Sequence, residues 1–496
     1  MRERFLVTPL GTAAGGLAAV AVLIFLITAL FGLFNPRDTS QPEGAVVAAA
    51  LRVANGDPLY LDVQKGPYVT TMYGPFFYLV LRGIVRVLGA GVTGAYLAGR
   101  LLSLGSALAG AALVGYLSGR YGASRPARWI ASGLFLASPL ILPVAYSSRT
   151  DVLAATLALA GVALFERWAD SSRCYLAAVP LVAAIYTKQT TLAALLAIVL
   201  FLLLRRRPAR AMGMAAAVIV PGAAILFLLI RATRGLASLN LIQVPGASPL
   251  SLLSRPAGGL VNFVSLAALP LILAAPVLPR LIRGDWSLRL PLCYAGAALA
   301  VSLASSAKLG SDTYYFIEPL AATLLLSAVG LTSLLGEGKT LSDRMGLLTF
   351  GALLVLLSGT VGMTVRTGEY RYVPNDGAIR VAAAAPGDVL IEDENVALKC
   401  GKPVTMMDPF AFAYMQRRGL WDAGPLNRRI EDRQFGVIIL RSPIEHPSHY
   451  QGATYWPDET LSAIGRAYVS GETVDGYVVY RPRPAMGEVA RERGRS

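Results

Sequence analysis

Charged residues, histidines and cysteines are all scarce in this sequence. Charged residues make up 15% of its 496 residues, whereas soluble domains average about 25%. The two histidines, His446 and His449, form a His-x-x-His pair that is only a weak signal for a metal. The three cysteines indicate no disulfide framework. This scarcity argues against an ordinary soluble domain and leaves a metal site unsupported.

Long apolar runs dominate the rest of the chain. Hydrophobic residues make up 55% of it and the mean hydropathy is +0.55, which predicts an integral membrane protein. The net charge of +15 could indicate a nucleic-acid partner, but arginines such as Arg205 to Arg207 directly follow apolar runs. Such arginines are topology signals first, so no nucleic-acid partner is expected. Gly338-Lys339-Thr340 lacks the glycine five residues before Gly338 that a phosphate-binding loop has, so neither ATP nor a nucleotide donor is expected.

Apolar runs of roughly 20 residues, and shorter ones where helices pack together, predict about eleven transmembrane helices. The first run follows Arg2 and Arg4 and lacks a small-residue cleavage site, which favours a retained helix over a signal peptide. The expected spans are 11–34, 93–119, 129–147, 151–168, 174–187, 190–204, 211–230, 258–279, 290–307, 314–336 and 345–365.

Arginine and lysine fall unequally on the two sets of loops between these spans. One set carries clusters, while the other carries mostly single charges such as Arg149, Lys188 and Lys308. By the positive-inside rule the richer set and the N-terminus are cytoplasmic, and an odd number of spans places the C-terminus outside the cytoplasmic (inner) membrane. The richer set comprises Arg2, Arg4, Arg120, Arg125, Arg128, Arg167, Arg173, Arg205 to Arg207, Arg210, Arg280, Arg283, Arg289, Lys339 and Arg344.

A long first external loop is expected at 35–92. Within it, Gln41 to Ala54 predicts a helix that Asn55 to Pro58 stops. The stretch Met72 to Leu88 is apolar but carries two arginines four residues apart, which favours an interfacial or half-inserted segment. Whether residues 71–90 span the membrane stays open.

Hydrophobicity drops after residue 365, the expected end of the transmembrane domain 1–365. Residues 366–483 alternate strand-like runs with helical pieces, which predicts a small extracytoplasmic α/β domain. Glu392 to Glu394 are interpreted as solvated loop acids, and the charged tail 484–496 as disordered. The fold class is therefore mainly α with a C-terminal α/β domain. The strand-like runs are Asp388 to Ile391, Pro403 to Met406, Phe435 to Leu440 and Gly476 to Tyr480.

Three charged residues, Glu43, Asp151 and Lys188, lie at the outer ends of expected spans. Each has an ordinary structural interpretation: Glu43 as a carboxylate at a helix N-terminus, Asp151 as a cap beside a snorkelling Arg149, and Lys188 as a turn residue. Charges near membrane depth cost a few kcal/mol, so several on one side favour a functional site. A carboxylate there could act as a general base on a hydroxyl, while lysine and arginine hold a leaving phosphate.

Four motifs in order resemble the GT-C superfamily of polytopic membrane glycosyltransferases, especially the protein O-mannosyltransferase and lipid A aminoarabinose transferase branch. That branch often has Asp-Glu where this chain has Pro42-Glu43, so only one carboxylate is available. The resemblance covers residues 1–365, and the departures leave the acceptor class and the subfamily open. The motifs are Pro42-Glu43-Gly44 with Met72 to Leu79, Arg149-Thr150-Asp151, Tyr186-Thr187-Lys188, and Asp312 to Pro319.

The resemblance implies an inverting transfer of a sugar, a hexose or a pentose, from a polyprenyl-phosphate-linked donor to an acceptor hydroxyl at the outer face of the membrane. Glu43 would be the general base, and Asp151 would orient the sugar or a basic neighbour. Lys188 and Arg149 would bind the donor phosphate. The residues implied to line the cavity are Tyr73, Tyr314 and Tyr315.

Other functions stay open. A multi-pass transporter or lipid flippase is the main alternative, although paired halves with broken helices are not found and the outer domain disfavours it. A glycan ligase or polymerase of another architecture is a third. No cofactor is expected, and a divalent cation held partly by Asp57 or Asp62 has no supporting pattern. The sequence does not indicate the sugar, the acceptor (lipid, glycan or protein), the polyprenyl length or the oligomeric state.

Overall fold

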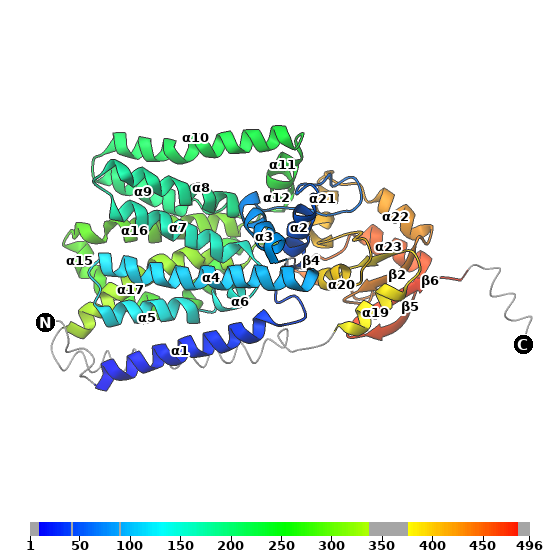
Figure 1. Cartoon of the computed structure of the whole chain (residues 1–496), viewed down its shortest axis with the longest axis horizontal. Coiled ribbons are helices and arrows are strands. Elements are labelled where there is room, and N and C mark those ends of the chain that lie inside the picture. Colours follow the sequence, from blue (N-terminus) through cyan, green and yellow to red (C-terminus); the bar gives the residue numbers. More distant parts are fainter. Residues whose placement is uncertain (1–8, 41–42, 89–90, 337–374, 485–496) are drawn as a thin grey trace, which may run out of the picture.

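The computed structural model describes residues 9–40, 43–88, 91–336 and 375–484. Long helices run roughly parallel at one end of the molecule, and a smaller α/β domain lies at the other (Figure 1). The main bundle helices are α1 (Pro9–Leu33), α4 (Val92–Arg120), α5 (Arg125–Ala137), α7 (Thr150–Arg167), α8 (Ala178–Thr187), α9 (Ala193–Leu204), α10 (Pro208–Ala232), α13 (Ser254–Leu266), α16 (Arg289–Ser306) and α17 (Ile317–Gly336), and the shorter helices α14 (Ala268–Ala274) and α15 (Leu278–Ile282) follow α13.

Several of these helices are as apolar as a membrane span requires. Among the described residues, four helices are long and apolar enough to cross a membrane, and a bent pair adds a fifth if it counts as one span. The multi-pass character is confirmed, whereas eleven crossings stay a prediction. The expected span 345–365 lies outside the described residues. The four helices are Val92–Arg120, Pro208–Ala232, Trp286–Ser306 and Thr313–Ser333, and shorter apolar helices lie at Ala18–Leu33, Ser172–Thr187 and Ala193–Leu204.

Burial separates central helices from peripheral ones. The apolar window of the helix at Thr313–Ser333 is 89% buried inside the protein, while that of α10 is 11% buried. Helix α17 contacts α5, α14 and α16, and α10 packs mainly on α8 and α9. Helix α17 is therefore central in the bundle and α10 is peripheral.

Two expected spans are interrupted near prolines. The span expected at 129–147 stops being helical after Ala137, and a separate turn, α6 (Leu142–Ala145), follows. Ser138 has ψ of 136° because the proline after it disfavours helical geometry. The span expected at 258–279 consists of two helices bent by 72°. There Pro270 lacks the N–H that would continue the helical ladder to the carbonyl of Leu266.

Two helices of the first external loop pack against the bundle. Helix α2 (Glu43–Asn55) corresponds to the expected helix from Gln41 to Ala54, of which residues 41–42 lie outside the described ranges. Gly56, which follows the helix, has a φ of +96° that suits glycine. Helix α3 (Pro75–Leu88) contacts α2, α4 and α8. Its 14 residues are too few to cross a bilayer.

The C-terminal domain is built on a four-stranded sheet with the order β1-β2-β6-β5. Strands β1 and β2 pair in parallel, and the other two pairs are antiparallel. The strands expected near 388, 435 and 476 are present, but β5 was not predicted. The elements are α19 (Asp376–Ala384), β1 (Asp388–Ile391), α20 (Glu394–Lys399), α21 (Pro409–Arg417), α22 (Gly424–Glu431), β2 (Phe435–Leu440), the β3 (His449–Tyr450) and β4 (Ala453–Thr454) ribbon, α23 (Asp458–Ala467), β5 (Tyr468–Val474) and β6 (Tyr477–Pro482).

The segment 403–406, predicted as a strand of this sheet, instead joins the domain to the first external loop. Tyr68 forms a parallel bridge with Met406. The Tyr68 N–H donates to the Thr405 carbonyl at 2.8 Å, and the Met407 N–H donates to the Tyr68 carbonyl at 2.9 Å. Tyr68 also packs edge-on against Trp421, with ring centroids 5.6 Å apart. The first loop and the C-terminal domain therefore share one hydrophobic core.

Candidate active site

A cavity of about 210 Å³ lies where the helix bundle meets the C-terminal domain. Its lining residues come from the first loop, from the turns before α7 and after α8, and from the C-terminal domain. A smaller side cavity shares Lys188 and Tyr315 with it and adds Asp151 and Tyr314. The main cavity is lined by Met72, Tyr73, Arg149, Lys188, Gln189, Thr190, Leu241, Pro245, Ser248, Lys308, Leu309, Gly310, Ser311, Asp312, Tyr315, Asp408, Phe410, Tyr414 and Tyr450.

Asp151 joins the two predicted phosphate-binding cations at the cavity wall. Its carboxylate accepts from Lys188 Nζ at 2.5 Å and from Arg149 Nε at 2.9 Å. All three side chains are buried, because Asp151 opens α7 while Lys188 caps the end of α8, and these helices pack together. One carboxylate thus faces two buried cations, which is the type of charged cluster that marks a site within a membrane protein.

Aromatic rings hold the same two cations from the other side. The Arg149 guanidinium lies 4.6 Å from the Tyr314 ring centroid, and Lys188 Nζ lies 4.0 Å from that of Tyr315. Both tyrosines belong to the short 3-10 turn Thr313–Phe316 before α17. Cation–π contacts of this kind orient a charge without neutralising it. Both cations therefore line the main cavity while paired with Asp151.

Glu43 lies outside both cavities, in a closed network of hydrogen bonds. It is 0% exposed, and Arg100 donates to both of its oxygens at 2.8 and 2.9 Å. The backbone N–H groups of Thr39 and Ser148 donate to the same carboxylate at 2.7 Å each. A carboxylate with these partners has no room for an acceptor hydroxyl. Glu43 thus ties the first loop to α4 through Arg100, and its role as general base stays a prediction.

Arg100 was not singled out from the sequence, although a signal for it exists. It is a single arginine within the apolar run 93–119, and it is 2% exposed. Besides Glu43, it donates to the carbonyls of Gly32, Leu33, Asn35 and Arg37. A charge inside a span requires a partner, so an arginine at this position predicts a buried acid nearby.

The acids Glu392 to Glu394, interpreted above as solvated, are buried at the junction with the first loop. Glu394 accepts from the Ala45 N–H at 2.7 Å, at the start of α2. Burial raises the pKa of Glu394 to about 8, and that of the neighbouring Asp38 to about 7. The prediction of solvated acids was wrong because the sequence does not show that α2 docks on this part of the C-terminal domain.

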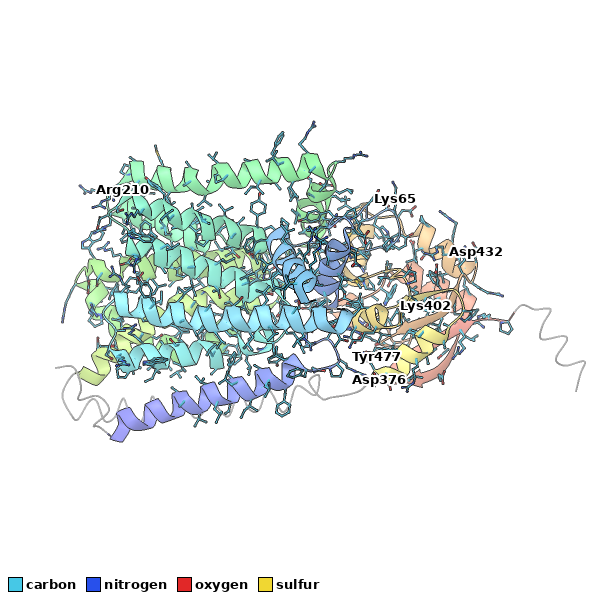
Figure 2. All side chains as sticks on the ribbon, in the orientation of Figure 1. Lys65, Arg210, Asp376, Lys402, Asp432 and Tyr477 are labelled. Atoms are coloured by element: carbon cyan, nitrogen blue, oxygen red, sulfur yellow. The ribbon has the colours of Figure 1, made fainter. Side chains whose placement is uncertain are left out.

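The two sets of loop arginines separate to opposite ends of the bundle. Arg120, Arg167 and Arg205 line one cavity far from the C-terminal domain. Figure 2 shows Arg210 at that far end, whereas Lys65, Lys402 and Tyr477 lie at the domain end. The grouping agrees with the predicted topology, while which end faces the cytoplasm stays a prediction.

No cluster of three His, Cys, Asp or Glu side chains suited to a metal ion occurs among the residues that the structure describes. His449 lies on the short β3 strand and is exposed, and Asp62 pairs with Lys65 at 3.6 Å. Neither contributes to the cavity.

Comparison with known proteins relates both the sequence and the fold to membrane glycosyltransferases. Residues 64–204 match the family model of the alpha-(1->6)-mannopyranosyltransferase N-terminal domain, the MptA/B family. The fold is similar to ArnT from Cupriavidus metallidurans in the apo state, at 16% identity over 94% of this chain and 100% of that chain, with a TM-score of 0.59. ArnT bound to undecaprenyl phosphate gives a TM-score of 0.57, at 16% identity over 95% of this chain and 99% of that chain.

A third solved structure, the apo oligosaccharyltransferase from Archaeoglobus fulgidus, is similar at 12% identity over 86% of this chain and 70% of that chain, with a TM-score of 0.53. No curated protein sequence matches the chain. These findings confirm the predicted resemblance to GT-C membrane glycosyltransferases. The sugar, the acceptor and the roles of single residues are not tested by them.

Proposed function

We propose that this protein is an inverting glycosyltransferase that moves a sugar from a polyprenyl-phosphate-linked donor to an acceptor hydroxyl. The observation that carries the proposal is the pair Arg149 and Lys188, buried together at one cavity wall around the Asp151 carboxylate. The donor is a phosphodiester, and its leaving group gains a second negative charge as the sugar departs. Two fixed cations stabilise the transition state, in which this charge develops, more than they stabilise the ground state. Such a difference accelerates the transfer.

The place of the cavity supports an enzyme over a transporter. It lies at one end of the bundle, and its wall includes Asp408 and Tyr450 of the C-terminal domain. A transporter site would be expected near the middle of the bundle, between paired broken helices. A lipid-linked donor can place its phosphate at such an end while its chain stays among apolar helices.

Relatives suggest what to test first. The matching family model is named for alpha-(1->6)-mannopyranosyl transfer, so mannose is the first sugar to test. ArnT has been solved with undecaprenyl phosphate, which supports a polyprenyl phosphate as the carrier lipid. We further propose the predicted orientation, with the cavity and the C-terminal domain on the outer side of the cytoplasmic membrane.

The test is a transfer assay with purified protein in nanodiscs. Polyprenyl-phosphate mannose is supplied with a mannoside acceptor, and both the new glycoside and the released polyprenyl phosphate are measured. We expect the two products in equal amounts, with the anomeric configuration inverted. Movement of the intact donor across sealed vesicles, without either product, would replace this proposal with the flippase.

A further inference from the structure

The short ribbon of β3 and β4 lies where the C-terminal domain meets the bundle (Figure 1). Tyr450 pairs with Ala453, so Gln451 and Gly452 form the turn between the two strands. Their φ angles are +50° and +80°. Two successive positive φ angles are typical of a type I′ turn, which favours asparagine and glycine. Glutamine is not a preferred residue at the first position, and contacts of its side chain account for it.

The Gln451 side chain binds the backbone at the edge of the main cavity. Its Oε1 accepts from the Gly310 N–H at 2.9 Å, and its Nε2 donates to the Ser311 carbonyl at 2.7 Å. Gly310 and Ser311 both line the main cavity. One amide group therefore fixes the position and the direction of this segment.

Contacts within the bundle hold the residue before this segment. The Leu309 N–H donates to the Pro249 carbonyl at 2.8 Å, and the Ser248 hydroxyl donates to the Leu309 carbonyl at 2.7 Å. Among the described residues, no other hydrogen bond reaches the Gly310 N–H or the Ser311 carbonyl. The C-terminal domain therefore fixes the backbone just before Asp312 through Gln451.

Asp312 connects this segment to the two cations of the candidate site. It caps the 3-10 turn Thr313–Phe316 by accepting from the N–H and the hydroxyl of the next residue, at 2.6 and 3.1 Å. Its other oxygen lies 3.7 Å from Arg149 Nη1. The tyrosine rings that contact Arg149 and Lys188 belong to the same turn. A shift of the backbone before Asp312 would therefore move the contacts that orient both cations.

Tyr450, the residue before Gln451, belongs to the main cavity itself. Its ring packs edge-on against Phe410, with centroids 5.3 Å apart. Burial and the charge of Asp312 raise the pKa of Tyr450 to about 12, while the charge of Arg149 acts in the opposite direction. The Tyr450 hydroxyl is thus close enough to this ion pair to respond to both charges. Two neighbouring side chains of the ribbon therefore contact the same part of the cavity.

From these contacts we infer that Gln451 is a positioning residue for the phosphate-binding pair Arg149 and Lys188. It acts through the turn Thr313–Phe316, so that the C-terminal domain sets the affinity of the cavity for a polyprenyl phosphate. The inference rests on the proposed function and assigns no chemical step to Gln451. Loss of one or two hydrogen bonds corresponds to a change in affinity of about 3- to 10-fold.

The test compares Gln451→Asn with Gln64→Asn. Asparagine favours the positive φ of the turn, so the ribbon should fold, but its amide is one methylene too short to keep both hydrogen bonds. Gln64 is a matched control because its amide makes the same pair of contacts elsewhere. It donates to the Leu420 carbonyl at 2.7 Å and accepts from the Asp422 N–H at 3.2 Å, and it lines neither cavity.

The measurements are calorimetric titration of polyprenyl phosphate into the full-length protein in nanodiscs, and transfer from polyprenyl-phosphate mannose. We expect Gln451→Asn to raise the Kd of polyprenyl phosphate by about 3- to 10-fold and to lower kcat/KM for the donor at least as much. The KM for the acceptor should not change. A merely structural role would instead lower the number of binding sites per molecule and leave the Kd of the remaining sites unchanged.

Gln451→Met is a second variant, which keeps the length of the side chain and removes both hydrogen bonds. It should shift the Kd as Gln451→Asn does, while Gln64→Asn keeps the wild-type Kd. Wild-type Kd in both Gln451 variants, or an equal shift in Gln64→Asn, would overturn the inference and leave the proposed function standing. Absence of transfer and of polyprenyl-phosphate binding in the wild type would overturn both.

Discussion

Lys188 and Arg149 have different geometries at the phosphate side of the cavity. Lys188 is a compact point charge beside Asp151, whereas Arg149 is fixed through its guanidinium by Asp151, Asp312 and Tyr314. An ammonium can turn toward a phosphate oxygen without losing a planar contact. At the scale of single residues, Lys188 is therefore the cation to vary first.

Lys188→Ala should weaken the binding of polyprenyl phosphate and lower kcat for transfer, because it removes a charge that offsets the leaving phosphate. Lys188→Arg should restore only part of both, since a guanidinium differs in shape and hydration. Binding by calorimetry and transfer rates are the measurements. Wild-type binding and turnover in Lys188→Ala would reduce the residue to a packing contact between two helices.

A second prediction concerns Glu43, whose substitution should change the stability of the protein more than its activity. Glu43→Gln leaves Arg100 buried without its charge partner, and breaking a buried pair in this way costs about 3–5 kcal/mol. We expect a clear fall in melting temperature, with transfer per folded molecule within a few-fold of wild type. A catalytic base would give the reverse result, an unchanged melting temperature with transfer lowered by about 10²-fold or more.

At the scale of elements, the contact between the first loop and α8 positions the cavity wall. A Cβ on Gly74 would lie 2.1 Å from the Tyr186 carbonyl oxygen, and backbone atoms cannot yield as a flexible side chain can. Gln189 reinforces this approach by donating to the Met72 carbonyl at 2.8 Å. Tyr73 and Lys188 are thus placed by one close contact between two backbone segments.

Gly74→Ala should therefore cost about 1–3 kcal/mol by overpacking and should lower transfer, since Lys188 lies two residues after the displaced carbonyl. Gly83→Ala is the control: it lies in α3 of the same loop with nothing within 4 Å of its added Cβ, so it should keep activity and melting temperature. Equal melting temperatures and rates for both variants would show that the loop adapts freely at Gly74.

The sequence predicts elements better than it predicts contacts between them. Apolar runs place α4, α10, α16 and α17 correctly, because helix formation in a span depends on local hydropathy. The strand-like runs place β1 and β2 for a similar local reason. The end of the helix at Ala137 depends on one proline, and a hydropathy average over the whole apolar run does not reveal it.

The candidate site also shows this difference between elements, which the sequence predicts, and contacts between distant elements, which it does not. Arg149, Lys188 and Tyr315 meet in one cavity as the motifs predict, since each lies at the same end of a span. The enclosure of Glu43 by Arg100, 57 residues later, and the place of Asp408 at the cavity depend on packing between segments that are not neighbours in the sequence. Such pairings leave no local pattern, so a single sequence cannot reveal them.

At the scale of the whole molecule, the C-terminal domain is fastened to the first loop through buried acids. Asp38 and Glu394 each have one oxygen without a hydrogen-bond partner among the described residues. Burial raises both pKa values, that of Glu394 from 4.5 to about 8. The charges of Asp393 and Glu43 add to this effect on Asp38, and those of Asp38 and Asp408 add to it on Glu394. Arg441 acts in the opposite direction on Glu394. The junction therefore favours the protonated acids.

This junction gives a pH dependence whose sign follows from linkage. An acid with a raised folded pKa binds more protons folded than unfolded, so its contribution is present in full below about pH 4.5 and is lost as pH rises through about 8. We expect the melting temperature to fall between pH 5 and 9, on the order of a few degrees.

Glu394→Gln removes the titration while keeping an oxygen for the Ala45 N–H, so its melting temperature should depend less on pH than that of the wild type. Glu431→Gln, an exposed acid of the same domain paired with Arg466, should follow the wild-type slope, and identical slopes for all three proteins would show that Glu394 stays ionised in the folded protein.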